Sequence, residues 1–201
     1  MIRLRSLTAT ALLVVAVFIS CRSGRPSGQP IAPLTATSPD DAMQQLRARR
    51  DAFRGAKSLM RVRATTNGKT QSFRAQLVVH DRQRMELIAY TPVGTTAAII
   101  RAEGERVSID NRIEGTQTEG NVSQVFGFLG TAMPPAEMAM LILGLPPREG
   151  LAYEVDAGGL RSARAGDVTA TFESPSFPAR MVVITRGSDR VEIEHLEVVS
   201  S

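Results

Sequence analysis

The sequence predicts a mainly β fold of the α+β class. The expected architecture is an incomplete antiparallel β-barrel of about ten to eleven strands, with an N-terminal helix and a helical lid. From Ser58 onward, short segments alternate apolar and polar residues, as strands with one buried face do. Tight turns separate these segments, and Asn67-Gly68 is a strong hairpin signal. Only residues 39–53 and 121–147 have a helical pattern, so most of the chain is expected in the sheet.

Residues 1–20 have the pattern of a secretory signal peptide. Arg3 and Arg5 precede an apolar run from Ala9 to Ile19, which is too short to span a bilayer. The only cysteine, Cys21, follows closely, and a single thiol cannot form an internal disulfide. The preceding residues, in the sequence FISC, resemble a bacterial lipobox, in which the cysteine is acylated and becomes the new N-terminus. Cys21 is therefore the expected lipidation site; the alternative is plain secretion with an incidental cysteine.

Residues 21–38 are expected to form an acylated, flexible tether. They are rich in Pro, Gly, Ser and Thr and contain few large apolar side chains to offset the entropy lost on ordering. Such a tether would let the domain stand clear of a membrane surface. Residues 39–201 suffice for one domain with a sizeable core.

The first expected element is a helix that ends near Phe53. Ser38 is a good N-cap, Pro39 suits the first turn, and Asp40 places an acid near the helix N-terminus. The expected strand segments follow in the order 58–66, 70–79, 84–91, 95–102, 106–110, 113–120, 151–156, 168–173, 178–185 and 190–199.

Residues 121–147 interrupt the strand pattern. Val122 to Leu129 is apolar at helical spacing, and Pro134-Pro135 opens a second short helix that Gly144 is expected to cap at its C-terminus. Two interpretations stay open. The segment is either an ordinary buried helix that closes one end of the sheet, or a lid over an apolar cavity, for which Met138 offers an adaptable surface.

The turn between the third and fourth expected strands carries an unexpected aliphatic residue. Turn tips are usually polar, yet Val93 stands between Pro92 and Gly94. Either the loop folds back onto its own domain, or Pro92 and Gly94 stiffen the turn and hold Val93 outward as a membrane-contact point.

The distribution of charge and the amino-acid composition limit the kinds of partner that the protein can bind. From Asp41 to Arg84 there are 11 Lys and Arg against 3 Asp, whereas from Met85 onward 9 Arg face 16 Asp and Glu. The export signal, the 4% aromatic content and the absence of Trp argue against nucleic acid. An anionic lipid surface or an acidic partner suits the basic half better; two solvated faces that pair with each other are the alternative.

The sequence contains no recognisable catalytic arrangement. Its two histidines, His80 and His195, lack the spacing of a metal site, and there is no nucleophile elbow or phosphate-binding loop. We therefore expect a protein that is not an enzyme and that has no metal and no cofactor.

Three stretches together resemble a known family: RMELIAYTPVGTTAAII, LGTAMPPAEMAMLILGLP and FPARMVVITRGSDRVEIEHLEV. Their order and spacing are similar to those of the LolB-like outer-membrane lipoprotein receptors, of the LolA/LolB-like half-barrel superfamily. The family's strand–turn–strand pattern is matched by residues 91–95, and its helix ending in I-L-G-L-P by residues 142–146. Family members often have Trp where this chain has Leu141, and Leu at the tip where it has Val93.

The resemblance implies an incomplete barrel around a hydrophobic cavity closed by helices. It also implies a receptor on the periplasmic side of the outer membrane, where it is lipid-anchored. Such a receptor accepts acylated lipoproteins from a LolA-like periplasmic carrier and inserts them into the membrane lipid; we expect it to be a monomer. The alternatives are a lipid or glycolipid carrier or sensor on the same fold, and a structural envelope lipoprotein. The residues expected to line the acyl cavity and its lid are Leu77, Val79, Leu87, Ala89, Ile99, Phe126, Leu129, Met138, Leu141, Ile142 and Met181.

Overall fold

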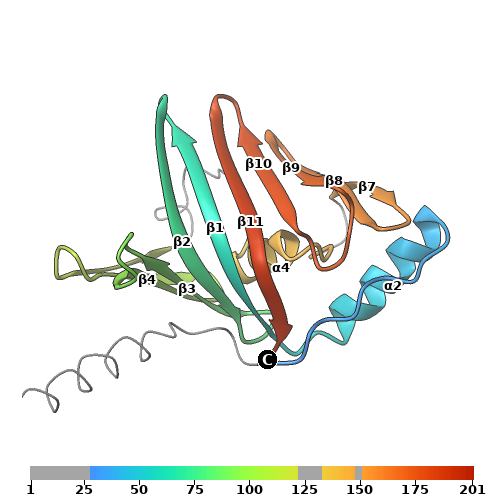
Figure 1. Cartoon of the computed structure of the whole chain (residues 1–201), viewed down its shortest axis with the longest axis horizontal. Helices are drawn as coiled ribbons and strands as arrows, with labels where there is room; N and C mark the ends of the chain where they lie inside the picture. The colour runs from blue at the N-terminus through green and yellow to red at the C-terminus, as the bar shows by residue number, and fades with distance from the viewer. Residues whose placement is uncertain (1–27, 122–132, 148–150) are drawn as a thin grey trace, which may run out of the picture.

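The computed structural model describes residues 28–121, 133–147 and 151–201, and these contain two helices and eleven strands (Figure 1). The helices are α2 (Pro39–Asp51) and α4 (Pro135–Ile142). The strands are β1 (Ala56–Thr66), β2 (Lys69–Val79), β3 (Arg84–Tyr90), β4 (Thr96–Glu103), β5 (Arg106–Asn111), β6 (Thr116–Asn121), β7 (Ala152–Asp156), β8 (Gly159–Ala165), β9 (Val168–Glu173), β10 (Met181–Arg186) and β11 (Asp189–Ser200).

All eleven strands form one antiparallel sheet in the order β6-β5-β4-β3-β2-β1-β11-β10-β9-β8-β7. Strands that follow each other in the chain pair with each other, except β6 and β7, which lie at opposite edges of the sheet. The pairing of β1 with β11 joins the two halves at the centre of the sheet. The sheet bends around α4, and its two edge strands, β6 and β7, remain unpaired to each other (Figure 1). The expected incomplete antiparallel barrel is therefore confirmed as an open, strongly curved sheet.

Helix α2 begins as the sequence indicates and lies at the β7–β8 side of the sheet (Figure 1). The hydroxyl of Ser38 accepts a hydrogen bond from the Asp41 amide at 3.2 Å, which satisfies one of the free N–H groups of the first turn. The side chain of Leu46 is fully buried and fixes the helix on the core.

The segment before α2 is docked on the domain, which differs from the flexible tether expected for 21–38. The end of β11 extends beyond β10, and Pro30 bridges to Val199 on this free edge. The Ser200 amide donates to the Gln29 carbonyl at 2.9 Å. The guanidinium of Arg49 on α2 donates to the carbonyls of Ala32 and Pro33. These hydrogen bonds, together with Ile31 and Leu34, which pack against the core, hold residues 28–38 on the domain.

The core lies on the concave face of the sheet. In β1 the inward residues Met60 and Val62 are buried, and the intervening Arg61 is exposed. Arg61 forms an ion pair with Glu194 of the neighbouring β11 at 2.5 Å. A basic side chain of the first half of the chain thus pairs with an acidic one of the second half, as one of the two charge interpretations expects.

Helix α4 ends in the way predicted from Gly144. The Gly144 amide donates to the Leu141 carbonyl at 2.8 Å, and the Leu145 amide donates to the Met140 carbonyl at 2.9 Å. This pair of bonds is a Schellman motif, which requires a left-handed residue after the helix. Gly144 has φ of 92°, and an added Cβ would lie 3.2 Å from Ala179, so both the conformation and the space favour glycine.

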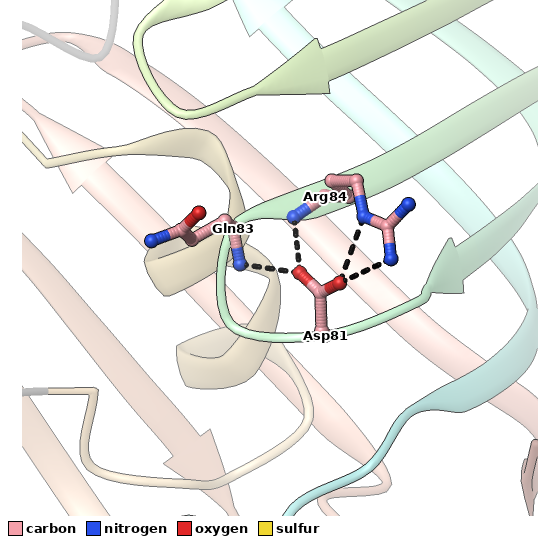
Figure 2. A network of polar contacts seen from close by, with 3 residues as sticks. All are labelled: Asp81, Gln83 and Arg84. Atoms are coloured by element: carbon pink, nitrogen blue, oxygen red, sulfur yellow. Dashed lines mark hydrogen bonds and ion pairs between the residues drawn. The ribbon is translucent and has the colours of Figure 1, made fainter.

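A carboxylate organises the turn between β2 and β3 (Figure 2). Asp81 Oδ1 accepts hydrogen bonds from the amides of Gln83 and Arg84 at 2.8 and 2.9 Å, and Oδ2 pairs with the Arg84 guanidinium at 2.7 Å. The hydrogen bond from the Gln83 amide contributes most to lowering the pKa of Asp81, and the side-chain bond from Arg84 contributes next. This turn joins the long central strands to β3, where the sheet changes direction (Figure 1).

Candidate functional site

An apolar cavity of about 260 Å³ lies between the concave face of the sheet and α4. Every side chain around it is apolar, and the lining comes from α4 and the residue before its N-cap together with strands β1, β2, β3, β4, β10 and β11. The lining residues are Met60, Val62, Ala64, Phe73, Leu77, Met85, Leu87, Ile100, Met133, Pro135, Met138, Ala139, Ile142, Ile184, Val191 and Ile193.

The burial of these residues shows where the cavity opens. Met60 and Leu77, in the middle of their strands, are almost fully buried. Ala64, Phe73 and Val191 lie toward the β1–β2 and β10–β11 hairpin turns and are only partly buried. The cavity is therefore closed beside the middle of β1 and β2. It is more accessible toward the hairpin ends and beside β3 and β4, where Leu87 and Ile100 are also only partly buried.

Four of the residues expected to line an acyl cavity do line this one: Leu77, Leu87, Met138 and Ile142. Val79 is fully buried in the core beyond the cavity wall, and Ala89 is half-buried and does not line the cavity. Phe126, Leu129 and the expected lipidation site Cys21 lie outside the described residues.

Three expected lining residues face elsewhere. Ile99 alternates with Ile100, which lines the cavity, so Ile99 lies on the other face of β4. Met181 likewise lies opposite to Ile184 in β10. Leu141 is buried on a different side of α4 from Ile142, where it packs near Leu151 beside a space of only about 10 Å³. The expected facing of β4 and β10, and the expected role of Leu141 in the cavity wall, are corrected accordingly.

A buried serine–histidine pair ties α4 to the sheet. Ser58 Oγ lies 2.7 Å from His195 Nδ1, and His195 Nε2 lies 3.0 Å from the carbonyl oxygen of Ile142. A carbonyl only accepts, so Nε2 carries the proton and Nδ1 accepts from the Ser58 hydroxyl. Both ring nitrogens are used, which leaves none for the carboxylate that orients the histidine in a Ser-His-Asp catalytic triad. Ser58 is also fully buried. The pair therefore holds the C-terminal end of α4 in place.

Burial sets the protonation state of this histidine. Desolvation lowers the pKa of His195 to about 4, although its hydrogen bond to the Ile142 carbonyl opposes the decrease. The ring is consequently neutral near pH 7. Sequence reasoning missed the pair because Ser58 and His195 are 137 residues apart.

The tip between β3 and β4 holds its aliphatic residue outward. The Gly94 amide donates to the Thr91 carbonyl at 2.9 Å, and the hydroxyls of Thr91 and Thr95 lie 2.8 Å apart. Gly94 has φ of 88°, with open space where a Cβ would be. Val93 is 86% exposed. The tip is thus a hydrogen-bonded turn that presents one valine to solvent, and it does not fold back on the domain.

A larger groove lies at the ends of β3–β6 that are opposite to the Val93 tip, and its walls carry charged side chains. Its volume is about 590 Å³, and its walls include Arg84, Glu86, Arg101 and Glu119. Arg101 Nε lies 2.6 Å from Glu86 Oε2. A hydrocarbon chain would leave these charges poorly solvated, so the smaller apolar cavity is the better candidate for an apolar ligand.

No helix within residues 28–121, 133–147 and 151–201 has the length and hydrophobicity needed to cross a bilayer. The same residues do not bring three or more His, Cys, Asp or Glu side chains together in a metal-binding arrangement.

Comparison with solved structures finds a similar fold in several bacterial proteins. A domain from Vibrio parahaemolyticus, assigned to outer membrane lipoprotein sorting, aligns with a TM-score of 0.56 and 9% identity over 80% of this chain and 91% of that chain. A DUF1329 family protein from Desulfovibrio piger aligns with a TM-score of 0.52 and 10% identity over 82% and 94%. A LolA superfamily protein from Nitrosomonas europaea aligns with a TM-score of 0.48 and 7% identity over 80% and 94%. Identities this low speak for the fold alone.

Sequence comparison identifies the family. No curated protein matches the chain. The model of the family described as "Outer membrane lipoprotein LolB" matches residues 59–186. This range covers most of β1, all of β2 through β10, the Val93 tip and every cavity-lining residue except Val191 and Ile193. This match spans more than half of the sequence, and the fold and cavity agree with it. The chain belongs to the LolB family of outer membrane lipoproteins.

Proposed function

We propose that the protein is an outer-membrane-anchored receptor that accepts acylated lipoproteins from a LolA-like periplasmic carrier and inserts them into the outer membrane. The observation that carries the proposal is the wholly apolar cavity beneath α4, more accessible toward the hairpin ends of the sheet. Membership of the LolB family supports the same function. No catalytic step and no cofactor is required.

The cavity offers what an acyl chain needs. A chain of about 16 carbons in water is unfavourable by on the order of 12 kcal/mol, at roughly 0.8 kcal/mol per methylene. A cavity without polar side chains replaces water by an environment comparable to lipid. The direction of transfer then follows from small differences in affinity between carrier, receptor and bilayer, without an energy source at this step.

We infer that α4 moves when cargo enters. About 260 Å³ is slightly below the roughly 300–1,000 Å³ of typical ligand pockets. The C-terminal end of α4 is tied by His195 to the Ile142 carbonyl and by the Ala179 amide, which donates to the Leu143 carbonyl at 3.0 Å. The N-cap, Pro134, makes no side-chain capping bond. A pivot about the tied C-terminal end would widen the cavity and carry Met138 outward.

The anchor and the Val93 tip complete the proposal. Acylation of Cys21 would attach the protein to the membrane, and the described chain begins seven residues later at Gly28. Pro92, Val93 and Gly94 would then form the membrane-contact loop during delivery. Full burial of one valine contributes only about 1.5 kcal/mol or more, so the tip orients a domain that is already attached.

Depletion of the protein in its own host tests the proposal. Other lipoproteins should then accumulate before the outer membrane, and expression of the wild-type chain should restore their localisation. A matched control is the variant Ala139→Phe, which narrows the cavity and should fail to restore it. Normal localisation after depletion would refute the receptor function.

A lipid or glycolipid carrier or sensor is the second candidate. The small volume favours it, since about 260 Å³ accommodates a single chain more readily than several. Lipid that copurifies with the protein, combined with normal lipoprotein localisation after depletion, would identify this function instead. A structural envelope lipoprotein is less well supported, because a filled core would leave no such cavity.

A further inference from the structure

A second aliphatic residue stands at a neighbouring hairpin tip. Ile113, between β5 and β6, is 72% exposed, and among the described residues Val93 and Ile113 are the most exposed large apolar side chains. Isolated apolar residues on a surface are common. Two at the tips of adjacent hairpins are less so, because turns normally carry Gly, Pro, Asn, Asp or Ser.

The two tips lie at the same end of the sheet. β4 begins directly after the Val93 turn, and its Ala98 pairs with Asn111, the last residue of β5. The Arg112 amide donates to the Ala97 carbonyl at 2.9 Å. The Ile113 turn is therefore beside the start of β4, and the centres of the two turns are about two strand spacings, roughly 10 Å, apart. Figure 1 shows this green part of the sheet turning away from the long central strands.

The Ile113 turn is held as firmly as the Val93 turn. Asn111 Oδ1 accepts hydrogen bonds from the amides of Ile113 and Glu114 at 3.1 and 3.2 Å. Asn111 Nδ2 donates to Glu114 Oε2 at 2.9 Å, and Arg112 pairs with Asp110 at 2.7 Å. The polar side chains of the turn thus bind one another and leave the isoleucine pointing outward.

We propose that Ile113 is a second bilayer-contact residue, which acts together with Val93 to orient the domain on the membrane. This inference rests on the proposed function, in which Val93 touches the bilayer. An acyl anchor and one contact define a line about which the domain still rotates. A further contact beside that line removes the rotation and fixes the direction in which the cavity faces.

A bilayer fits these two residues better than a protein partner does. Each tip is a single aliphatic side chain surrounded by polar residues, which is too small an apolar surface for a stable protein interface. Insertion into the interfacial layer needs no complementary pocket. The charged residues of the turn are Asp110, Arg112 and Glu114, which leave no excess of positive charge, so the contact should not require anionic lipid.

Tryptophan fluorescence can place each tip, because the chain contains no Trp. The variants are Val93→Trp, Ile113→Trp and, as a matched control, Leu196→Trp, whose residue on β11 is 40% exposed but lies away from the tips. Each acylated protein is reconstituted without cargo into phosphatidylcholine vesicles that contain brominated lipid. We expect quenching at positions 93 and 113 and none at 196.

Tryptophan itself favours membrane interfaces, so a second measurement tests position 113 without placing a tryptophan there. In the Val93→Trp protein, Ile113→Ser should lower the ratio of inserted to free tip, read from the tryptophan at position 93. A decrease of about tenfold or more corresponds to full burial of one aliphatic side chain, and partial burial gives a smaller decrease. Leu196→Ser in the same background should leave this ratio unchanged.

The outcomes separate the two proposals. Quenching at 93 without quenching at 113, and no effect of Ile113→Ser, would overturn the inference and leave the Val93 contact standing. Absence of quenching at 93 would remove the membrane contact of the proposed function, and the inference with it. If the fluorescence of tryptophan at position 113 changes only when a carrier protein is added, and not with vesicles, the partner is a protein and the inference is overturned.

Discussion

The same substitution at two adjacent residues of α4 should affect stability and acyl binding to different degrees. Leu141 is buried in close packing and does not line the cavity, whereas Ile142 is partly exposed and lines it. Leu141→Ala and Ile142→Ala each remove an aliphatic side chain from the last turn of one helix. The two variants therefore compare a closely packed side chain with a cavity-lining side chain at nearly the same place in the fold.

The expected magnitudes follow from the space around each residue. Beside Leu141 there is only about 10 Å³ of free volume, so truncation leaves a new cavity and should lower the free energy of unfolding by about 3 kcal/mol, within the 2–5 kcal/mol range of such changes. Ile142→Ala widens a cavity that already exists. Its cost should be roughly 1 kcal/mol, because little new cavity is created and Ala favours the helix.

Urea denaturation followed by circular dichroism measures both stabilities, and a fluorescent fatty acid measures acyl binding. With a slope of about 2 kcal/mol per M urea, the two variants should differ in midpoint by about 1 M. Ile142→Ala should change the affinity for the fatty acid, and folded Leu141→Ala should bind like the wild type. Equal losses of stability with unchanged binding in both variants would refute the assignment of the cavity as the acyl site.

The remaining predictions concern the cavity, the histidine and the membrane contacts. Ala139→Phe should fill the cavity and weaken fatty-acid binding while the protein stays folded in circular dichroism, and unchanged binding would contradict the assignment. The unfolded state binds a proton at His195 near pH 6.5 and the folded state only near pH 4. The contribution of His195 is thus fully present above pH 6.5, and the free energy of unfolding should fall by on the order of 3 kcal/mol toward pH 4; a His195→Gln variant with the same pH slope in denaturant titrations would refute this. Fatty-acid labelling in cells should be lost in Cys21→Ala, and equal labelling would remove the anchor. Val93→Glu should fold and accept cargo normally but deliver it to liposomes more slowly; delivery at the wild-type rate would count against the tip contact.

The fold was predictable wherever a local pattern has one physical solution. Ser38 and Gly144 mark helix ends because few other residues satisfy the free backbone groups there. Alternation in β1, with Arg61 between Met60 and Val62, identifies the buried face directly. The same alternation could have added these two residues to the expected cavity lining.

The inward face could not be predicted where both faces are apolar. Ile99 and Ile100 are both aliphatic, and residues 181–184 of β10 form a continuous apolar run. A register chosen from alternation has no basis in such runs. Strand β8 escaped prediction for a related reason, since Gly159–Ala165 contains two Arg and only one large apolar residue.

The other features that could not be predicted from the sequence depend on long-range contacts. The Ser58–His195 pair and the docking of residues 28–38 depend on groups that only the folded sheet brings together. The backbone bond between Ser200 and Gln29 has no signature in either segment. Such features need the tertiary structure, because nearly every residue carries a backbone donor and an acceptor and the sequence does not show which of them pair.

Photo-crosslinking of bound cargo tests the central claim most directly. A lipoprotein with a photoreactive group near the end of one acyl chain is presented by its carrier, and the crosslinked residues are identified by mass spectrometry. The account predicts crosslinks to cavity residues such as Phe73, Met138 and Ile142, and their loss in Ala139→Phe. Crosslinks to the charged groove around Arg84 and Arg101, or crosslinks unaffected by filling the cavity, would contradict it.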